Sequence, residues 1–482
     1  MQTLSILSIK QRKFHGIICK FFFWTFLILS ISGCHNSQRN NKEDIPKNDI
    51  IQQSTPKPRV NVFIENGGSM DGFVLGGVTD FKEVIGKLLP QIKDQYSDST
   101  GDNIHIYFIH NSKDDSELIV EDIFEKDVTS YIEAIEMKWK EIKRNQTRGN
   151  NTELNTLFRS ILDSTEDNTI SILISDCIYS IGRGEVENKL NAQKGITYDS
   201  FLNKLKNRED LETMIIQMSS NFTGYYYPCT GDSHRYYINN ERLNYYICIV
   251  GNHRDIDDFN DNIVKFNKDR QSFKGFNNQH LFSRTQINPY YSVLLYTKPQ
   301  NVHFKAPREE LTKDAVHSIV DIETINKGSS CRGRSISDSS NHFEFTIAID
   351  LSSIDLENEY LLSTSNYYLS DDNFKITDIR PIDRKIVNSA DWKRISSKSP
   401  THTITFRANS NIYSDVTIGL KRKKPNWITQ SSTHNDTIRD TIIAGKTFAL
   451  EYWFNGISDA YEYKNRDKKV DSYFEITIKI QK

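Results

Sequence analysis

Oxygen-bearing side chains stand at three points of the chain where an apolar strand ends or a helix begins. They are Glu65, Ser69 and Asp71 after one apolar run, Thr152 ahead of a helical segment, and Asp176 after a second apolar run. In open α/β sheets ligands bind at the carboxyl ends of the strands, so these hydroxyls and carboxylates are candidate ligand-binding groups. Each is equally suited to a simpler role, because Ser, Thr and Asp are the usual capping and turn residues.

These groups lie in a segment where short apolar runs alternate with helical patterns. The runs that indicate strands are 60–64, 104–109, 171–174, 214–218 and 246–250. Apolar residues recur at helical spacing in 81–96, 128–142, 154–162 and 201–205. Strands that alternate with helices favour a mostly parallel sheet with helices on both faces. We therefore predict an α/β domain over residues 59–275.

Three motifs in this domain resemble those of von Willebrand factor A domains, in the same order and with approximately the same spacing. They are VFIENGGSM around Ser69, RGNNTELNTLFRSIL around Thr152, and ISILISDCIYS around Asp176. The resemblance implies a metal-ion-dependent adhesion site, in which hydroxyls and carboxylates hold Mg²⁺ or Mn²⁺ and a partner's carboxylate completes the shell. Such a hard cation prefers oxygen ligands.

Two positions depart from the family pattern. Glu65 stands where the family has Asp and is one methylene longer, and Gly67 stands where the family has a ligating serine. Asp71 is close enough in sequence to substitute for the missing ligand. The expected site is therefore a degenerate one formed by Glu65, Ser69, Asp71, Thr152 and Asp176.

The first 34 residues have the layout of a secretory signal. Four basic residues precede the apolar run 21–31, which is shorter than the roughly 20 residues a membrane-spanning helix needs. The ending Ile-Ser-Gly-Cys resembles the lipobox of bacterial lipoproteins, which implies lipidation at Cys34. We predict a signal peptide over 1–33, a polar tether over 34–58, and a lipid anchor in the cell envelope, on the periplasmic side or at the cell surface.

The chain from residue 280 to 482 is expected to be rich in β-strands. Apolar residues alternate with polar ones in 343–349, 416–420, 448–454 and 474–480. Such alternation, with Asn, Asp, Ser and Gly turns between the runs, indicates one or two immunoglobulin-like sandwiches. The Ala-Gly-Lys-Thr run at 444–447 is interpreted as a turn that enters a strand, because a phosphate-binding loop requires a glycine at position 440, which is Asp.

A tyrosine-rich segment and a pair of cysteines add two further expectations. Residues 222–250 predict a β-hairpin whose tyrosines either anchor a partner or cover the sheet edge. Export makes an oxidising compartment possible, so Cys229 and Cys248 are a candidate disulfide across this hairpin, with Cys177 and Cys331 as other available cysteines.

Charge and motifs favour binding over catalysis. The net charge of −2 becomes −6 once the four basic residues of 1–33 are removed, which leaves 57 basic and 63 acidic residues and no general attraction to nucleic acid. Nucleophile-elbow, HExxH and dinucleotide-binding motifs are absent. We expect a lipoprotein that binds a protein partner in the envelope. The alternatives are a metal-assisted hydrolase that uses Glu65, Asp71 and Asp176, or a structural scaffold with an inactive site.

Overall fold

The computed structural model describes most of the chain after residue 55. The described residues are 56–482 without 115–116, 124–129, 150–152, 182–183, 230–233, 300–301, 324–341, 355, 409–412, 438–444 and 464–470. The predicted signal segment, Cys34, most of the tether, Thr152 and Cys331 lie outside the described residues.

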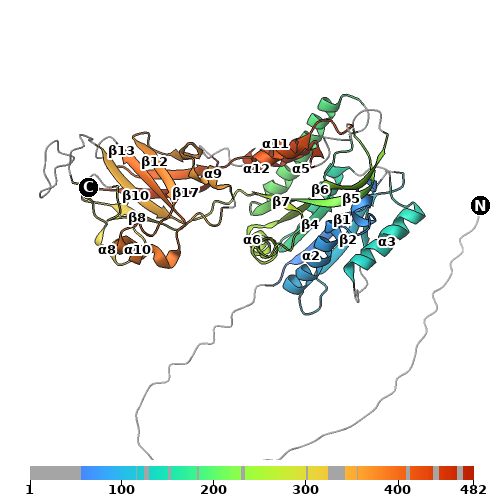
Figure 1. Ribbon diagram of the computed structural model, residues 1–482, viewed down its shortest axis with the longest axis horizontal. Helices are drawn as coiled ribbons and strands as arrows, with labels where there is room; N and C mark the ends of the chain where they lie inside the picture. The colour runs from blue at the N-terminus through green and yellow to red at the C-terminus, as the bar shows by residue number, and fades with distance from the viewer. Residues whose placement is uncertain are drawn as a thin grey trace, which may run out of the picture. The chain divides into compact units, whose positions relative to one another are not determined.

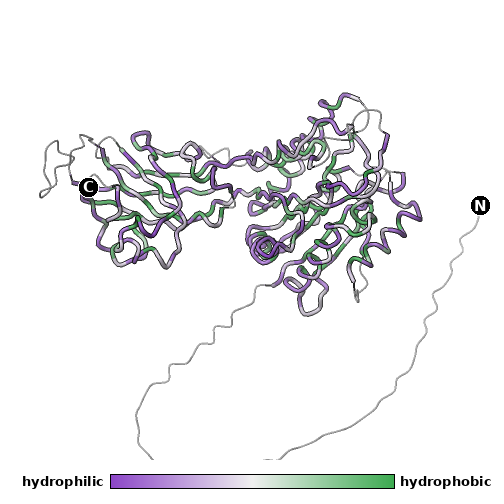
Figure 2. The backbone as a smooth tube through the Cα atoms, viewed as in Figure 1, coloured by the Kyte–Doolittle hydropathy of each residue, from purple (hydrophilic) through white to green (hydrophobic). Residues whose placement is uncertain are grey.

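A seven-stranded sheet forms the centre of the first folded part (Figure 1). In spatial order its strands are β3 (Leu118–Asp122), β2 (Ile104–Asn111), β1 (Arg59–Glu65), β4 (Thr169–Ser175), β6 (Tyr236–Asn252), β5 (Leu211–Tyr226) and β7 (Phe276–Phe282). The sheet thus includes β7, which follows the predicted domain end at residue 275. Hydrophobic residues run along the inner strands in Figure 2, which is typical of strands buried on both faces.

Helices cover both faces of this sheet, and each face has its own apolar core. One core contains α1 (Asp71–Val74), α2 (Asp80–Tyr96), α3 (Tyr131–Asn145), α6 (His253–Phe259) and the π-helical turn η2 (Asn260–Lys265). The other contains α4 (Leu154–Ser164), α5 (Val186–Asn207), α11 (Asn426–Ser431) and α12 (Leu450–Tyr463). Within β1, Val62 and Ile64 face the first core and Phe63 the second, because successive side chains of a strand alternate.

The sheet is mixed, so the prediction of a mostly parallel sheet is wrong. Only β1 pairs in parallel with its described neighbours, β2 and β4. The pairings β2–β3, β4–β6, β5–β6 and β5–β7 are antiparallel. The physical reason is the direct connection between β5 and β6: a hairpin forces antiparallel pairing, whereas a parallel pair needs a crossover of a dozen or more residues.

The strand expected at 448–454 is also wrong, because this segment is mainly helical. Thr447–Phe448 forms a two-residue strand (β16), which pairs with β15 (Ser432–Thr433), and α12 begins at Leu450. Trp453, Phe454 and Ile457 are all buried at helical spacing against α5 and the sheet. The alternation of apolar residues spans too few positions here to separate a strand from the start of an amphipathic helix.

The second folded part consists of two four-stranded sheets that share one apolar core. One sheet has the order β12 (Phe374–Pro381), β13 (His402–Ala408), β10 (Phe343–Ile349), β8 (Tyr291–Leu294), and all its pairs are antiparallel. The other has the order β11 (Tyr367–Leu369), β14 (Val416–Lys421), β17 (Ser472–Ile480), β9 (Ser318–Ile319). Its β17–β9 pair is parallel. Short helices α8 (Arg308–Leu311), α9 (Asn358–Leu362) and α10 (Ser389–Ile395) lie in connections of this part, whereas α7 (Phe266–Asp269) precedes β7 in the first part.

The described cysteines are all free, so the predicted Cys229–Cys248 pairing is not formed. In the sheet register Cys248 lies opposite Leu173 on β4 and Ile215 on β5, and its sulfur is 4.0 Å from that of Cys177. Cys229 instead lies beyond the end of β5, so the two residues are not neighbours across the hairpin. None of the described helices combines the length and the apolar composition required to cross a bilayer.

Candidate functional site

The carboxyl ends of β1 and β4 bring two of the predicted loops together. The two strands are parallel neighbours in which Ile64 lies opposite Ile174, so the residues that follow meet at one edge. The Ser175 hydroxyl donates a hydrogen bond to Glu65 Oε2 at 2.5 Å. We name this edge the rim and define it as Glu65, Asn66, Ser69, Asp71, Ser175 and Asp176.

Asp176 is buried at the centre of the rim, with 6% of its surface exposed. Its carboxylate accepts hydrogen bonds from the Ser69 hydroxyl and from the Ile178 backbone N–H, the latter at 3.2 Å. Burial raises the pKa of Asp176 from its ordinary value, and the Ser69 and Ile178 hydrogen bonds oppose this change. A charge buried at this place is costly unless donors or a cation accompany it.

Asp71 belongs to a different arrangement, because its carboxylate is held by positively charged and N–H groups. Trp139 Nε1 donates to Oδ1 at 2.9 Å, Lys143 Nζ to Oδ2 at 2.8 Å and Arg148 Nη2 to Oδ2 at 2.9 Å. The Arg148 side chain is only 12% exposed and also donates to Asn66 Oδ1 at 2.8 Å. Asp71 is therefore neutralised by two cations of the protein itself.

Arg148 is positioned by the strand that lies next to β1. Gly149 N donates to Asn111 O at the end of β2, and Arg148 forms an isolated bridge with Ser112. This pairing fixes the backbone of residues 148–149 beside the rim, from where the guanidinium reaches both Asn66 and Asp71. Sequence reasoning missed Lys143 and Trp139, because no motif on α3 links them to the rim. It also missed Arg148, which opens the motif RGNNTELNTLFRSIL, because only the oxygen-bearing Thr152 of that motif was considered as a ligand.

Tyrosines and a loop from the distant C-terminal segment cover the rim. A Cβ atom on Gly68 would lie 3.5 Å from the Tyr227 ring. Asp436, which is fully buried, accepts hydrogen bonds from Cys229 N at 2.7 Å and from the Tyr226 hydroxyl at 3.2 Å. Burial raises the pKa of the Cys229 thiol, and the nearby carboxylates of Asp436 and Asp176 raise it further.

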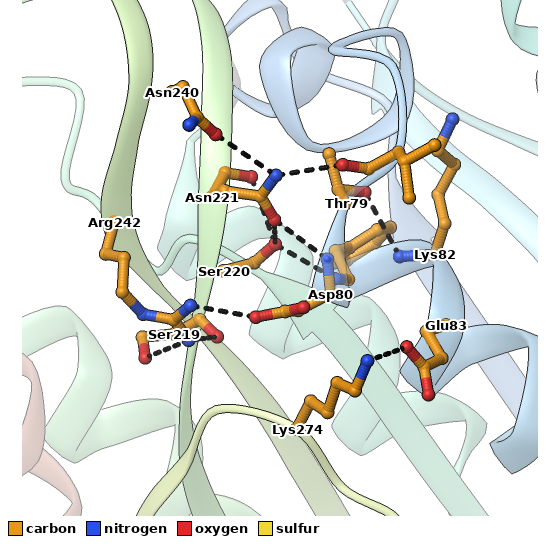
Figure 3. A network of polar contacts seen from close by, with 12 residues as sticks. Thr79, Asp80, Lys82, Glu83, Ser219, Ser220, Asn221, Asn240, Arg242 and Lys274 are labelled. Carbon is orange, nitrogen blue, oxygen red and sulfur yellow. Dashed lines mark hydrogen bonds and ion pairs between the residues drawn. The ribbon is translucent and has the colours of Figure 1, made fainter.

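A polar network joins residues 78–80, at the end of the segment that carries Ser69 and Asp71, to the β5–β6 hairpin (Figure 3). Asn221 Oδ1 accepts from Asp80 N at 2.9 Å, and Arg242 Nη1 donates to Asp80 Oδ2 at 2.8 Å. Asn221 Nδ2 donates to Val78 O, just before α2 begins. Gly72 adds close packing, because a Cβ atom there would lie 2.4 Å from the Phe222 ring. The hairpin is thus attached to the same loop that carries Ser69 and Asp71.

The arrangement fits a hard cation poorly. Magnesium needs near-ideal octahedral geometry with oxygen ligands. Gly67 offers no side-chain oxygen, and Asp71 is already bound by Arg148 and Lys143. Glu65 and Asp176 each accept a hydrogen bond from a rim hydroxyl, that of Ser175 and that of Ser69, and Thr152 lies outside the described residues.

A second polar cluster lies away from the rim. Within the described part of the chain, Glu212, His253 and Asp257 are the one group of three His, Cys, Asp or Glu residues whose ligand atoms lie within 4.8 Å of one another. Sequence reasoning missed this cluster, because Glu212 stands 41 residues before His253 and no motif joins them. The adjacency of β5 and β6 brings them together.

Comparison of the chain with protein-family models, with curated proteins and with solved structures finds no match.

Proposed function

We propose that this chain is a lipid-anchored binding protein of the bacterial cell envelope that recognises a protein partner without a metal ion at the rim. The signal-like segment and the lipobox-like ending at Cys34 support export and anchoring. The order of the three motifs around Ser69, Thr152 and Asp176 supports a von Willebrand factor A-like first part. The shared core of the two smaller sheets is compatible with an immunoglobulin-like second part.

The observation that carries this proposal is the engagement of Asp71 by Arg148, Lys143 and Trp139. A divalent cation at the rim would need Asp71 in place of the ligating serine that is absent at Gly67. Here two side-chain cations neutralise Asp71, and a third positive centre at the same place would be repelled. The same engagement argues against the metal-assisted hydrolase, which needs the Asp71 carboxylate for its ion.

The hairpin that covers the rim offers the surface for a partner. Tyr225, Tyr227 and Tyr237 are 43%, 42% and 48% exposed. The rings of Tyr225 and Tyr237 pack edge to face, with centroids 5.5 Å apart, and the Arg235 guanidinium lies 4.3 Å from the Tyr225 centroid. Tyrosine and arginine dominate the energetic centres of protein interfaces. Rings held by their neighbours lose little side-chain entropy on binding.

Site-specific photocrosslinking in cells tests the proposal. A photoreactive residue at position 225 is expected to give a specific crosslinked protein, whereas one at Met137, which is 68% exposed on α3, serves as the matched control. The identified protein, once purified, should bind with equal affinity in EDTA and in Mg²⁺. The double variant Tyr225→Ala, Tyr237→Ala should lower that affinity at least tenfold.

Two outcomes would oppose the proposal in different ways. Binding that requires Mg²⁺ or Mn²⁺ would restore the adhesion-site reading of the rim. Full affinity in the double tyrosine variant would instead favour the structural scaffold, in which the closed rim serves only to hold the hairpin. The burial of Asn66, Asp176 and Asp436 is the observation that favours this second candidate.

A further inference from the structure

His253 lies between two carboxylates at the edge of the sheet opposite the rim. In the register of β5 and β6, Glu212 lies across from Gly251, two residues before His253. Val250 in turn lies opposite Ser171, near the start of β4, which places this edge away from the carboxyl end of β4. His253 is the first residue of α6, and Asp257 follows it one helical turn later. The cluster is therefore built by the rigid sheet on one side and a helix on the other.

The imidazole of His253 has a carboxylate at each ring nitrogen. His253 Nδ1 is 2.9 Å from Glu212 Oε1, and Nε2 is 3.4 Å from Asp257 Oδ2. A neutral ring that donates its Nδ1 hydrogen to Glu212 presents the lone pair of Nε2 to Asp257. Two electron-rich atoms then face each other, and a positive charge between them would stabilise both.

Glu212 supplies an independent sign that the cluster accommodates a ligand. Its residue exposure is 1%, and the Ser283 hydroxyl donates to Oε1. Its other oxygen, Oε2, is buried and has no hydrogen-bond partner among the described residues. An unsatisfied buried carboxylate oxygen carries a desolvation cost, so Glu212 adds uncompensated negative charge to the cluster, which a cation bound nearby would stabilise.

We propose that Glu212, His253 and Asp257 form a binding site for a divalent transition-metal ion of the Zn²⁺ type. His253 Nε2 and Asp257 bind the ion directly, and their separation of 3.4 Å matches two ligands at about 2.0–2.2 Å from zinc. Glu212 orients the ring through Nδ1, which is the usual place of a carboxylate behind a metal-bound histidine. The remaining positions are open to water or to a ligand from outside.

Exposure and ligand type agree with this assignment. The side chains of His253 and Asp257 are 39% and 56% exposed, so an ion reaches them from solvent, whereas Glu212 is enclosed. Imidazole together with carboxylate suits Zn²⁺, Ni²⁺ and Cu²⁺, while Mg²⁺ prefers oxygen ligands alone. The site is thus distinct from the rim in both position and metal preference, and it does not depend on the proposed partner binding.

The test uses the purified full-length protein without a histidine tag. Titration with Zn²⁺ alone, followed by calorimetry, is expected to give one saturable site that excess Mg²⁺ does not displace. Co²⁺ should give visible absorption bands that appear with the same stoichiometry, because direct ligation alters the spectrum of that ion. Absence of saturable Zn²⁺ and Co²⁺ binding would overturn the proposal.

Variants assign the roles of the three residues. His253→Ala and Asp257→Asn should each abolish the cobalt bands, whereas Glu212→Gln should weaken zinc affinity by about 10- to 100-fold while the bands persist. His317→Ala, a change at an exposed histidine of the second part, should bind as the unmodified protein does. Circular dichroism confirms folding, and Asp257→Asn keeps the test decisive if Glu212→Gln fails to fold. Unchanged binding by His253→Ala would contradict the assignment.

Discussion

At the carboxyl ends of β1 and β4 the carboxylate of Asp71 meets side-chain cations, whereas at the opposite edge of the same sheet Glu212 and Asp257 meet an imidazole. The rim carries the motifs and the oxygen-rich loops, yet Arg148 and Lys143 supply the positive charge that a bound metal ion would otherwise bring. The other edge carries no motif, yet its geometry suits a metal ion. The groups that surround a carboxylate decide its chemistry more than the sequence around it.

The largest expected effect comes from removing the partly buried cation Arg148 at the rim. Arg148→Ala leaves Asp71, which is 13% exposed, and Asn66 without their guanidinium partner. The pair is partly buried and Asp71 keeps Lys143 and Trp139 as donors, so the loss of two charge-assisted hydrogen bonds should lower the free energy of unfolding by about 2–3 kcal/mol. Urea denaturation at neutral pH measures this loss of unfolding free energy.

Arg254→Ala is the matched control for that experiment. Arg254 also pairs with an aspartate but is 59% exposed, so its loss should cost at most about 1 kcal/mol. Equal effects of the two substitutions would show that the rim cation has no special structural role.

A smaller effect is expected at the centre of the rim. Ser69→Ala removes the hydroxyl that donates to the buried Asp176 carboxylate, which retains the Ile178 amide as a donor. The loss of one such hydrogen bond should cost about 1–2 kcal/mol in the free energy of unfolding. Ser200→Ala, at a partly exposed position of α5 where the hydroxyl donates only to the Ile196 carbonyl of the same helix, is the control. A rim held by the hairpin alone would show no difference between the two variants.

The effect of metal ions on Tm should distinguish the rim from the Glu212, His253 and Asp257 cluster. Saturating Zn²⁺ is expected to raise Tm by about 2 °C, because a ligand that binds only the folded state stabilises it by mass action. Excess Mg²⁺ should leave Tm unchanged, since neither edge offers a complete oxygen shell. Differential scanning calorimetry measures both, and the Zn²⁺ effect should vanish in His253→Ala. A Tm increase in Mg²⁺ that persists in His253→Ala would restore the rim as a metal site.

The smallest effect concerns pH at the rim. Burial raises the pKa of Asp176 in the folded protein, so the folded state binds its proton more tightly than the unfolded state. Protonated Asp176 therefore stabilises the folded state. This contribution is fully present below pH 3.8, the pKa of Asp176 in the unfolded chain, and is lost as pH rises through the pKa in the folded protein. Asp176→Asn removes this dependence of stability on pH. The free energy of unfolding of the variant, minus that of the unmodified chain, should therefore increase as pH rises. A difference that is constant with pH would contradict the effect of burial.

Periodicity predicted most of the elements around the rim. The runs 60–64, 171–174 and 246–250 are strands, and the helical spacing of 81–96 corresponds closely to α2. These assignments succeed because a period of 2 or 3.6 follows from which face of an element is buried. The segment 448–454 failed for the same reason, since its apolar positions are shared by a strand and by the start of α12.

The sequence by itself determined the local elements and the placement of Glu65 and Asp176 directly after two strands, because hydrophobic period and turn residues are local properties. Only the tertiary structure decided which charges lie beside them. Arg148 reaches Asp71 through pairing with the end of β2, and Glu212 reaches His253 through the register of β5 and β6. Electrostatic interactions depend on distance in space rather than along the chain, so the chemistry of both edges is set by strand pairing.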